Sequence, residues 1–234
     1  MGLFNAGSRN VGWFDGGSGN LGGFNSGSSN TGSFNAGSTN TGYFNAGYVN
    51  AGIANSGNSN TGLFNAGDLN TGLGSSSTPS GAVNSGFGNT STGSSGFFNT
   101  SYADSGFWNS SSGGLSSGFR NSGVGLGYAG LLNSGSGGNN VGLLNSGGSI
   151  NVGFMNSGGG SENTGFFNLG SGGANTGLWN WGGGAGNAGV FNSGNSNSGW
   201  ANSGSGNNSG FGNSGSVSSG GFNSGTEQSG FFNR

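Results

Sequence analysis

Residues 30–45 read Asn-Thr-Gly-Ser-Phe-Asn-Ala-Gly-Ser-Thr-Asn-Thr-Gly-Tyr-Phe-Asn, and they contain the ten-residue phrase that is copied from Gly2 to Gly72. The phrase is G-x-Φ-N-x-G-x-x-N-x, where Φ is usually Phe, so each copy holds two pentads that both carry N-x-G. A repeat with a fixed period determines the architecture, because equivalent positions of successive copies take equivalent places in space. The copies open at Gly2, Gly12, Gly22, Gly32, Gly42, Gly52, Gly62 and Gly72, and the Φ slot holds Phe4, Phe14, Phe24, Phe34, Phe44 and Phe64, with Ala54 and Gly74 as exceptions.

The composition excludes several classes of function. The 234 residues include 63 Gly but no Cys, and the net charge is −2. So weak a charge gives no electrostatic basis for binding nucleic acid or an anionic membrane surface. No apolar run approaches the ~20 residues that span a bilayer, and no signal peptide is visible. Because the chain begins and ends within the repeat, we expect it to be a segment of a longer protein.

The chain is predicted to be a single repeat array over residues 1–234. Residues 1–72 are regular decapeptides, and residues 73–85 interrupt them around Pro79, which cannot donate to a strand ladder. From residue 86 to 234 the copies resume, and many are stretched to eleven or twelve residues. The additions fall between the second Gly and the second Asn, which predicts a solvent-facing turn at that place.

The pattern predicts an all-β fold, a β-solenoid. Gly at every fifth residue disfavours a helix, and a period of five or ten matches no helical face. Short strands joined at N-x-G corners would stack ~4.8 Å apart, with columns of Phe inside and columns of Asn bonded amide to amide. Four pentads per coil would give a four-sided cross-section, and two would give a flattened ten-residue coil. We favour the four-sided form.

The phrase in residues 30–37 resembles the Asn-Gly-rich pentapeptide repeat of mycobacterial PPE proteins of the major polymorphic tandem repeat subgroup. The resemblance covers nearly the whole chain and implies a C-terminal repeat region that is exported by type VII secretion. Such a region is displayed on the cell envelope or released, and has no established activity. The PE partner of that family binds an N-terminal domain that these residues do not include. The chain also resembles, more distantly, pentapeptide-repeat proteins that form right-handed four-sided β-helices, although its second pentad departs from their pattern.

The sequence contains no group of residues with the types and spacing that catalysis requires. There is no His, and the five carboxylates are scattered, so acid–base catalysis, an activated nucleophile and a metal cage all lack their groups. We therefore expect no enzymatic activity and no cofactor. Asp15 is expected to replace an Asn in a ladder, and the other acids are expected in solvated turns. Four triplets match the glycosylation acceptor pattern, beginning at Asn89, Asn99, Asn109 and Asn207, and in so Asn-rich a chain they are attributed to chance.

The slot between Gly and Φ is the candidate interaction site. In the first third of the chain it varies, and later it is apolar in almost every copy. If Φ points inward, this slot points outward and forms an apolar ridge, which is typical of a partner surface. The alternative is a flipped or mixed register, which Arg120 in the Φ slot supports for its own coil. The candidate ridge residues are Phe97, Phe107, Leu131, Leu143, Phe154, Phe166, Leu178, Val190, Trp200 and Phe231.

The sequence thus predicts a non-enzymatic structural or surface-interaction domain of a secreted cell-envelope protein, such as an adhesin or a host-interaction module. Its partner would be an unidentified protein or envelope ligand, or a neighbouring copy in lateral self-association. The alternative is a disordered, cohesive, low-complexity segment rich in Phe, Gly and Asn.

Overall fold

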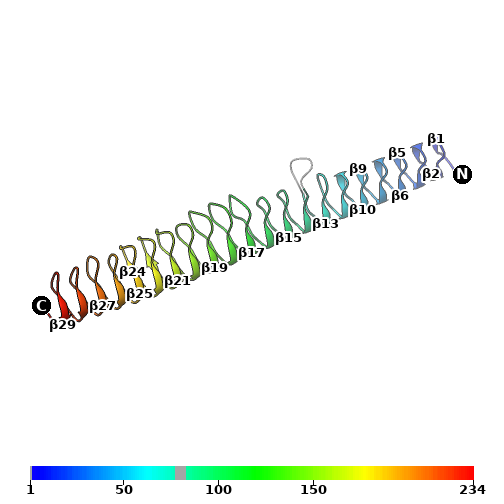
Figure 1. Ribbon diagram of the computed structural model, residues 1–234. Helices are drawn as coiled ribbons and strands as arrows, with labels where there is room; N and C mark the ends of the chain where they lie inside the picture. The colour runs from blue at the N-terminus through cyan, green and yellow to red at the C-terminus, as the bar shows by residue number, and fades with distance from the viewer. Residues whose placement is uncertain (1, 77–82) are drawn as a thin grey trace. The chain divides into compact units, whose positions relative to one another are not determined.

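The computed structural model describes residues 2–76 and 83–234, and within them the regular secondary structure is β-strand. These residues fall into two compact units, Met1–Asn109 and Ser110–Arg234. Each unit is a β-solenoid in which short parallel strands stack coil upon coil (Figure 1). The ordered coils give no support to the disordered alternative. The centre of the predicted interruption, around Pro79, lies outside the described residues.

The main sheet of the first unit consists of β2 (Val11–Trp13), β4 (Leu21–Gly23), β6 (Thr31–Ser33), β8 (Thr41–Tyr43), β10 (Ala51–Ile53), β12 (Thr61–Leu63), β13 (Thr71–Leu73), β14 (Ser85–Phe87), β15 (Ser95–Phe97) and β16 (Ser105–Phe107). Its second sheet consists of β1 (Ala6–Ser8), β3 (Gly16–Ser18), β5 (Ser26–Ser28), β7 (Ala36–Ser38), β9 (Ala46–Tyr48) and β11 (Ser56–Asn58).

The main sheet of the second unit consists of β17 (Ser117–Phe119), β18 (Ala129–Leu131), β19 (Val141–Leu143), β20 (Val152–Phe154), β21 (Thr164–Phe166), β23 (Thr176–Leu178), β25 (Ala188–Val190), β26 (Ser198–Trp200), β27 (Ser209–Phe211), β28 (Ser219–Gly221) and β29 (Ser229–Phe231). Two further strands, β22 (Leu169–Gly170) and β24 (Trp181–Gly182), pair on the other side of the coil.

The register shows that one regular coil contains ten residues, so the favoured four-sided cross-section is wrong. Gly42 pairs with Gly52, and Gly47 pairs with Gly57, whereas a four-sided coil would pair residues twenty apart. Two strands and two corners therefore close each turn, as in the flattened alternative. The physical reason is that, in the regular coils that the structure describes, Asn side chains form the interior, so the two sides of a coil approach each other across a layer of amides.

In each unit the equivalent glycines of successive main-sheet strands remain paired despite the interruption and the longer copies. Across the interruption Gly72 pairs with Gly86, and in the second unit Gly153 pairs with Gly165. In the stretched copies the side opposite the main sheet carries the additional residues, which lie mainly in turns and irregular backbone. The prediction that the additions occupy one side of the coil is confirmed.

The interior consists of two columns of buried asparagines. In the column of Asn45, the Oδ1 atom accepts the backbone N–H of Asn55 at 3.1 Å, and the Nδ2 atom donates to the carbonyl oxygen of Gly52 at 2.9 Å. Nδ2 also lies 3.3 Å from the carbonyl oxygen of Thr41 in its own coil. Each amide thereby links its own coil to the next, and the ladder satisfies polar groups that would be costly to bury alone. The predicted Asn ladders are confirmed.

The strand glycines are required by this hydrogen bonding and are not the predicted corner residues. Gly52 lies in the middle of β10 with φ at +128°, and a Cβ there would overlap the carbonyl oxygen of Gly62. Only glycine adopts this region without strain. Its carbonyl oxygen can consequently turn inward, where the Nδ2 atom of Asn45 donates to it.

The corners are formed by the residue before each Asn, which adopts a left-handed conformation. Phe44 has φ at +59° and Val49, at the opposite corner of the coil, has φ at +59°. Such a conformation costs ~1–2 kcal/mol per non-glycine residue, and the hydrogen bonds of the neighbouring Asn offset it. This turn directs Phe44 outward and Asn45 inward, so the expectation of Phe columns inside the solenoid is wrong. Among the described residues Tyr128 is the only buried hydrophobic side chain.

Several residues replace Asn in the ladders, among them buried serines such as Ser94, which accepts the backbone N–H of Asp104. Asp15 is buried and accepts the backbone N–H of Asn25 at 3.0 Å, which confirms its predicted place. Asp104 is fully buried in the other column, so its predicted place in a solvated turn is wrong. Tyr128 is also fully buried, and its Oη lies 2.6 Å from the carbonyl oxygen of Gly137. Burial raises the pKa of the Tyr128 hydroxyl by desolvation.

Candidate functional site: an apolar edge on each unit

The ridge residues occupy the last position of the main-sheet strands and lie in register. In the first unit Phe97 pairs with Phe107. In the second unit the ridge is continuous from strand to strand, with Phe211 and Gly221 between its last two candidates. Phe166 and Trp200 are about half exposed, whereas Leu143, Phe154 and Val190 are less accessible. The second-unit members are Leu131, Leu143, Phe154, Phe166, Leu178, Val190, Trp200 and Phe231.

The Φ residues form a second apolar column, which we call the Φ column, directly beside the ridge. In the first unit five phenylalanine rings stack face to face, with centroids 4.9–5.0 Å apart and interplanar angles of 4–14°. This distance matches the ~4.8 Å separation of hydrogen-bonded strands, so the sheet sets the ring spacing. The stacked rings are Phe4, Phe14, Phe24, Phe34 and Phe44, and their side chains are 47–75% exposed.

The ridge and the Φ column contact each other and form one surface, here called the apolar edge. Phe154 of the ridge meets Phe167 of the Φ column edge to face, at a centroid distance of 5.2 Å. Phe211 and Phe222 meet in the same way at 5.0 Å. Where the Φ slot holds Gly212, the ring of Phe222 lies over the space that a side chain would take. Aromatic pairs in this geometry stabilise each other beyond the area they bury.

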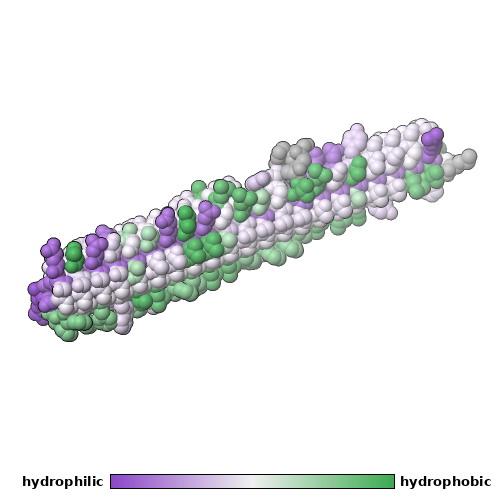
Figure 2. All heavy atoms as spheres, in the orientation of Figure 1, coloured by the Kyte–Doolittle hydropathy of each residue, from purple (hydrophilic) through white to green (hydrophobic). Residues whose placement is uncertain are grey.

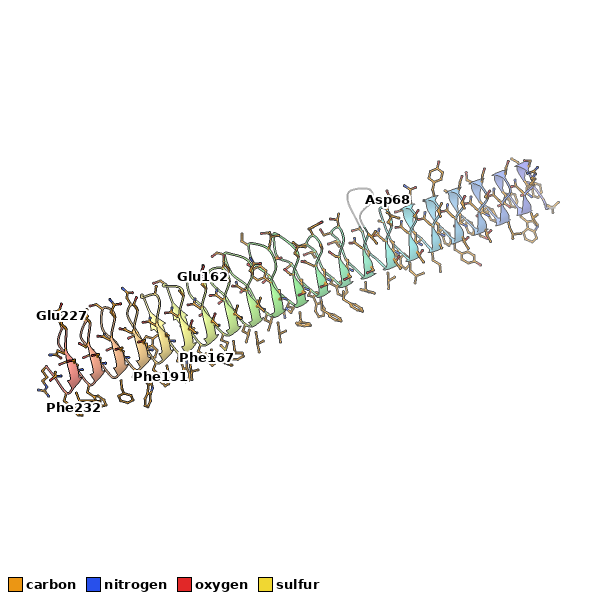
Figure 3. All side chains as sticks on the ribbon, in the orientation of Figure 1. Asp68, Glu162, Phe167, Phe191, Glu227 and Phe232 are labelled. Atoms are coloured by element: carbon orange, nitrogen blue, oxygen red, sulfur yellow. The ribbon has the colours of Figure 1, made fainter. Side chains whose placement is uncertain are left out.

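The opposite corner of the coil has a different character. Its positions with positive φ carry no aromatic residue among those described in residues 2–76 and 83–234. Figure 3 shows Phe167, Phe191 and Phe232 on one side of the second unit and Glu162 and Glu227 on the other. Hydrophobic residues form a band along one side of the view in Figure 2. Exposed hydrophobic residues also occur on the opposite side, among them Tyr48, Tyr102 and Trp181, but the columns of neighbouring aromatic rings lie on the apolar edge.

Two adjacent residues can both face solvent because the left-handed corner interrupts the alternation of a strand. Tyr43 ends β8 and is 51% exposed, and the next residue, Phe44, is 58% exposed. The ridge was predicted on the premise that Φ faces inward, so the Φ column itself was missed. Arg120 in the Φ slot was the available signal, because a dry interior column would not accept an arginine.

The remaining charged and modifiable residues do not gather at one place. Glu162 and Glu227 are exposed corner residues, as predicted, whereas Asp68 is half-buried and accepts the backbone N–H of Asn58 at 2.8 Å. Three asparagines of the acceptor triplets, Asn89, Asn99 and Asn109, are buried in the ladders and thus inaccessible to a glycosylating enzyme in the folded chain.

Metal-ligating clusters and membrane-spanning helices are absent from the part of the chain that the structure describes. No group of three or more His, Cys, Asp or Glu side chains there is placed to hold a metal ion. The described residues also form no helix of the length and hydrophobicity needed to cross a membrane.

Comparison with known proteins identifies the repeat. The family described as Pentapeptide repeats (8 copies) matches residues 1–38 and 39–78, which make up the first third of the chain. No curated protein and no solved structure matches the chain. The family match falls on the regular decapeptides, and the same pentads build the coils of both units. The first third of the chain therefore matches the pentapeptide-repeat family, and the solenoid built from the same pentads in both units supports a pentapeptide-repeat fold.

Proposed function

We propose that the chain is a non-enzymatic, surface-interaction module of a secreted cell-envelope protein and that it binds its ligand through the apolar edge. This proposal rests on the distribution of side chains, which is the reverse of the usual apolar interior and polar surface. Amides fill the interior, and the aromatic rings, which folding ordinarily buries, lie at the surface. Contiguous exposed apolar surface of this kind is typical of interaction sites.

The nature of the edge indicates the chemistry of the ligand. In the first unit no charged residue occupies the ridge or the Φ column among the residues described. The ring faces cover one another at 4.9–5.0 Å, so the stack presents mainly ring edges to solvent. A ligand must therefore match a long, narrow, uncharged hydrocarbon surface. The similarity of the repeat phrase to that of exported PPE proteins supports placing this surface at the cell envelope.

The binding part of the proposal is tested with three substitutions and a matched control. The edge variant carries Phe14→Asn, Phe24→Asn and Phe34→Asn. The control variant carries Thr39→Asn, Val49→Asn and Ser59→Asn at the opposite corner, where φ is 58–61°. Asn tolerates the left-handed region well, so neither set strains the backbone. We expect co-sedimentation with isolated cell envelopes to be lost in the edge variant and retained in the control; equal co-sedimentation of both would contradict the proposal.

The location is tested by treating intact producing cells with a protease and following the chain with an antibody. We expect the protein in the envelope fraction or the medium, and we expect the envelope-bound part to be digested while the cells stay intact. Recovery of the chain from the cytosol alone, protected from protease, would refute the secreted location.

A further inference from the structure

We propose that the occupant of the apolar edge is a second copy of this chain and that two copies form a closed, edge-to-edge dimer. This inference rests on the proposed function, because it names the partner of the same surface. Four properties of the edge carry it: its spacing, its area, its lack of charge and its occurrence on one corner only.

The spacing of the edge favours a partner with the same periodicity. Rings repeat at 4.9–5.0 Å from Phe4 to Phe44 along the Φ column, where the parallel pairing of successive strands sets the interval. If a partner had a different repeat distance, its contact groups would lie opposite a few of the rings and would be displaced from the others. A second copy has the same interval by construction, so each of its rings can lie against an equivalent position along the whole stack.

The area of the edge is sufficient for a stable dimer. From Leu3 to Phe44 the first unit exposes seven aromatic side chains, each between 47% and 75% accessible. At ~150–250 Å² per aromatic side chain they offer roughly 600–1,000 Å². A specific interface of standard size buries about 800 Å² on each partner. One stack thus reaches the required size before the second unit contributes.

The charge of the chain does not oppose the contact. The net charge is −2 over 234 residues, and the first-unit edge has no charged residue among those described. Repulsion between two copies is therefore small and is screened within about 8–10 Å at physiological ionic strength. Association through this edge should accordingly be insensitive to salt.

The single apolar edge limits the assembly to two copies. When the same patch of each copy covers the other, the contact is isologous and closes. The opposite side of the coil carries polar and small residues together with exposed hydrophobic ones, such as Tyr48, Tyr102 and Trp181, which lie in coils far apart along the chain. Within residues 2–76 and 83–234 it offers no second aromatic stack for a third copy. The structure therefore predicts a dimer and not an open-ended polymer.

Sedimentation equilibrium of the full chain tests the proposal, with the edge and control variants defined above. We expect a dimer for the wild type and the control variant, and a dissociation constant raised about a hundredfold or more in the edge variant. A second set, Phe167→Asn with Trp179→Asn and Phe191→Asn, should weaken the dimer through the second unit. A wild type that stays monomeric, or an assembly that the edge variant leaves unchanged, would overturn the inference.

A measurement on the unsubstituted chain covers the case in which a variant fails to fold. Trp13, Trp108, Trp179 and Trp200 lie on the apolar edge, whereas Trp181 begins β24 on the other side of the coil. Acrylamide quenching should fall as concentration rises through the dissociation constant, and unchanged quenching would overturn the dimer. If the chain is monomeric but the edge variant still loses envelope binding, the dimer is refuted while the proposed function stands.

Discussion

Replacing one ladder asparagine with an apolar side chain of the same shape should destabilise the first unit strongly. In Asn45→Leu the backbone N–H of Asn55 loses its acceptor, and the carbonyl oxygens of Gly52 and Thr41 lose their donor. Each buried group left without a partner costs ~1–3 kcal/mol. The three together predict a loss of about 3–9 kcal/mol in the free energy of unfolding.

Urea denaturation followed by far-UV circular dichroism measures that loss, and hydrogen exchange at the amide of Asn55 locates it. Because a repeat array opens locally, we expect exchange to accelerate most in the coils next to the substitution. Thr41→Val is the matched control, since it also exchanges a polar for an apolar side chain of similar shape but at an exposed position. It should change the free energy of unfolding by less than about 0.5 kcal/mol.

The opposite outcome would refute the account of the interior. If Phe44 were buried and Asn45 were at the surface, Asn45→Leu would be neutral and Phe44→Asn would unfold the unit. An Asn45→Leu protein that is as stable as the wild type, with the Asn55 amide still protected, would show that the amide ladder does not stabilise the fold.

Three further predictions follow from individual ladder and strand positions. Gly52→Ala should cost at least about 2 kcal/mol in urea denaturation, because its φ of +128° and the nearby carbonyl of Gly62 leave no place for a Cβ; a neutral effect would contradict the strand geometry. Asp15→Asn should stabilise the first unit by about 1–3 kcal/mol, since the Oδ2 atom of Asp15 has no hydrogen-bond partner and an amide nitrogen there would have one; a lower melting temperature would count against it. Tyr128→Phe should destabilise the second unit by about 1–3 kcal/mol at neutral pH, through loss of the hydroxyl hydrogen bond among three carbonyl oxygens. Because burial raises the pKa of Tyr128 above its ordinary value of 10.0, the wild type should lose stability as the pH rises above that value, and the difference from Tyr128→Phe should shrink there; a difference that is constant with pH would exclude this coupling.

The period of the repeat was sufficient to predict the solenoid, the stacking of equivalent slots and the side on which the longer copies bulge. These features follow from spacing alone, because a strict repeat places equivalent glycines over one another whether a coil holds ten or twenty residues; the structure shows ten, with Gly42 paired to Gly52. The number of pentads per coil and the direction of each side chain could not be obtained in this way. They depend on the left-handed φ of Phe44 and on the inward-turned carbonyl of Gly52, which a hydrophobicity pattern does not encode.

The ordinary rule that aromatic residues are buried also misplaced the candidate site. It predicted the ridge but assigned Phe4 to Phe44 to the interior, where the structure instead has Asn columns. The rule fails here because the left-handed corner directs the Φ residue outward and the following Asn inward. The interior does accommodate an Asn amide. Its Nδ2 atom donates to backbone carbonyl oxygens, and its Oδ1 atom accepts from the next Asn of the same column.

The accessibility of the tryptophans to acrylamide in dilute, folded protein tests the central claim most directly. All five tryptophans, Trp13, Trp108, Trp179, Trp181 and Trp200, are 41–63% exposed. At concentrations well below those at which copies associate, we predict water-like emission and efficient quenching, together with a β-type circular dichroism spectrum that melts cooperatively. Blue-shifted emission with protected tryptophans in the dilute folded chain would place the aromatic side chains inside and contradict an interior built from asparagine.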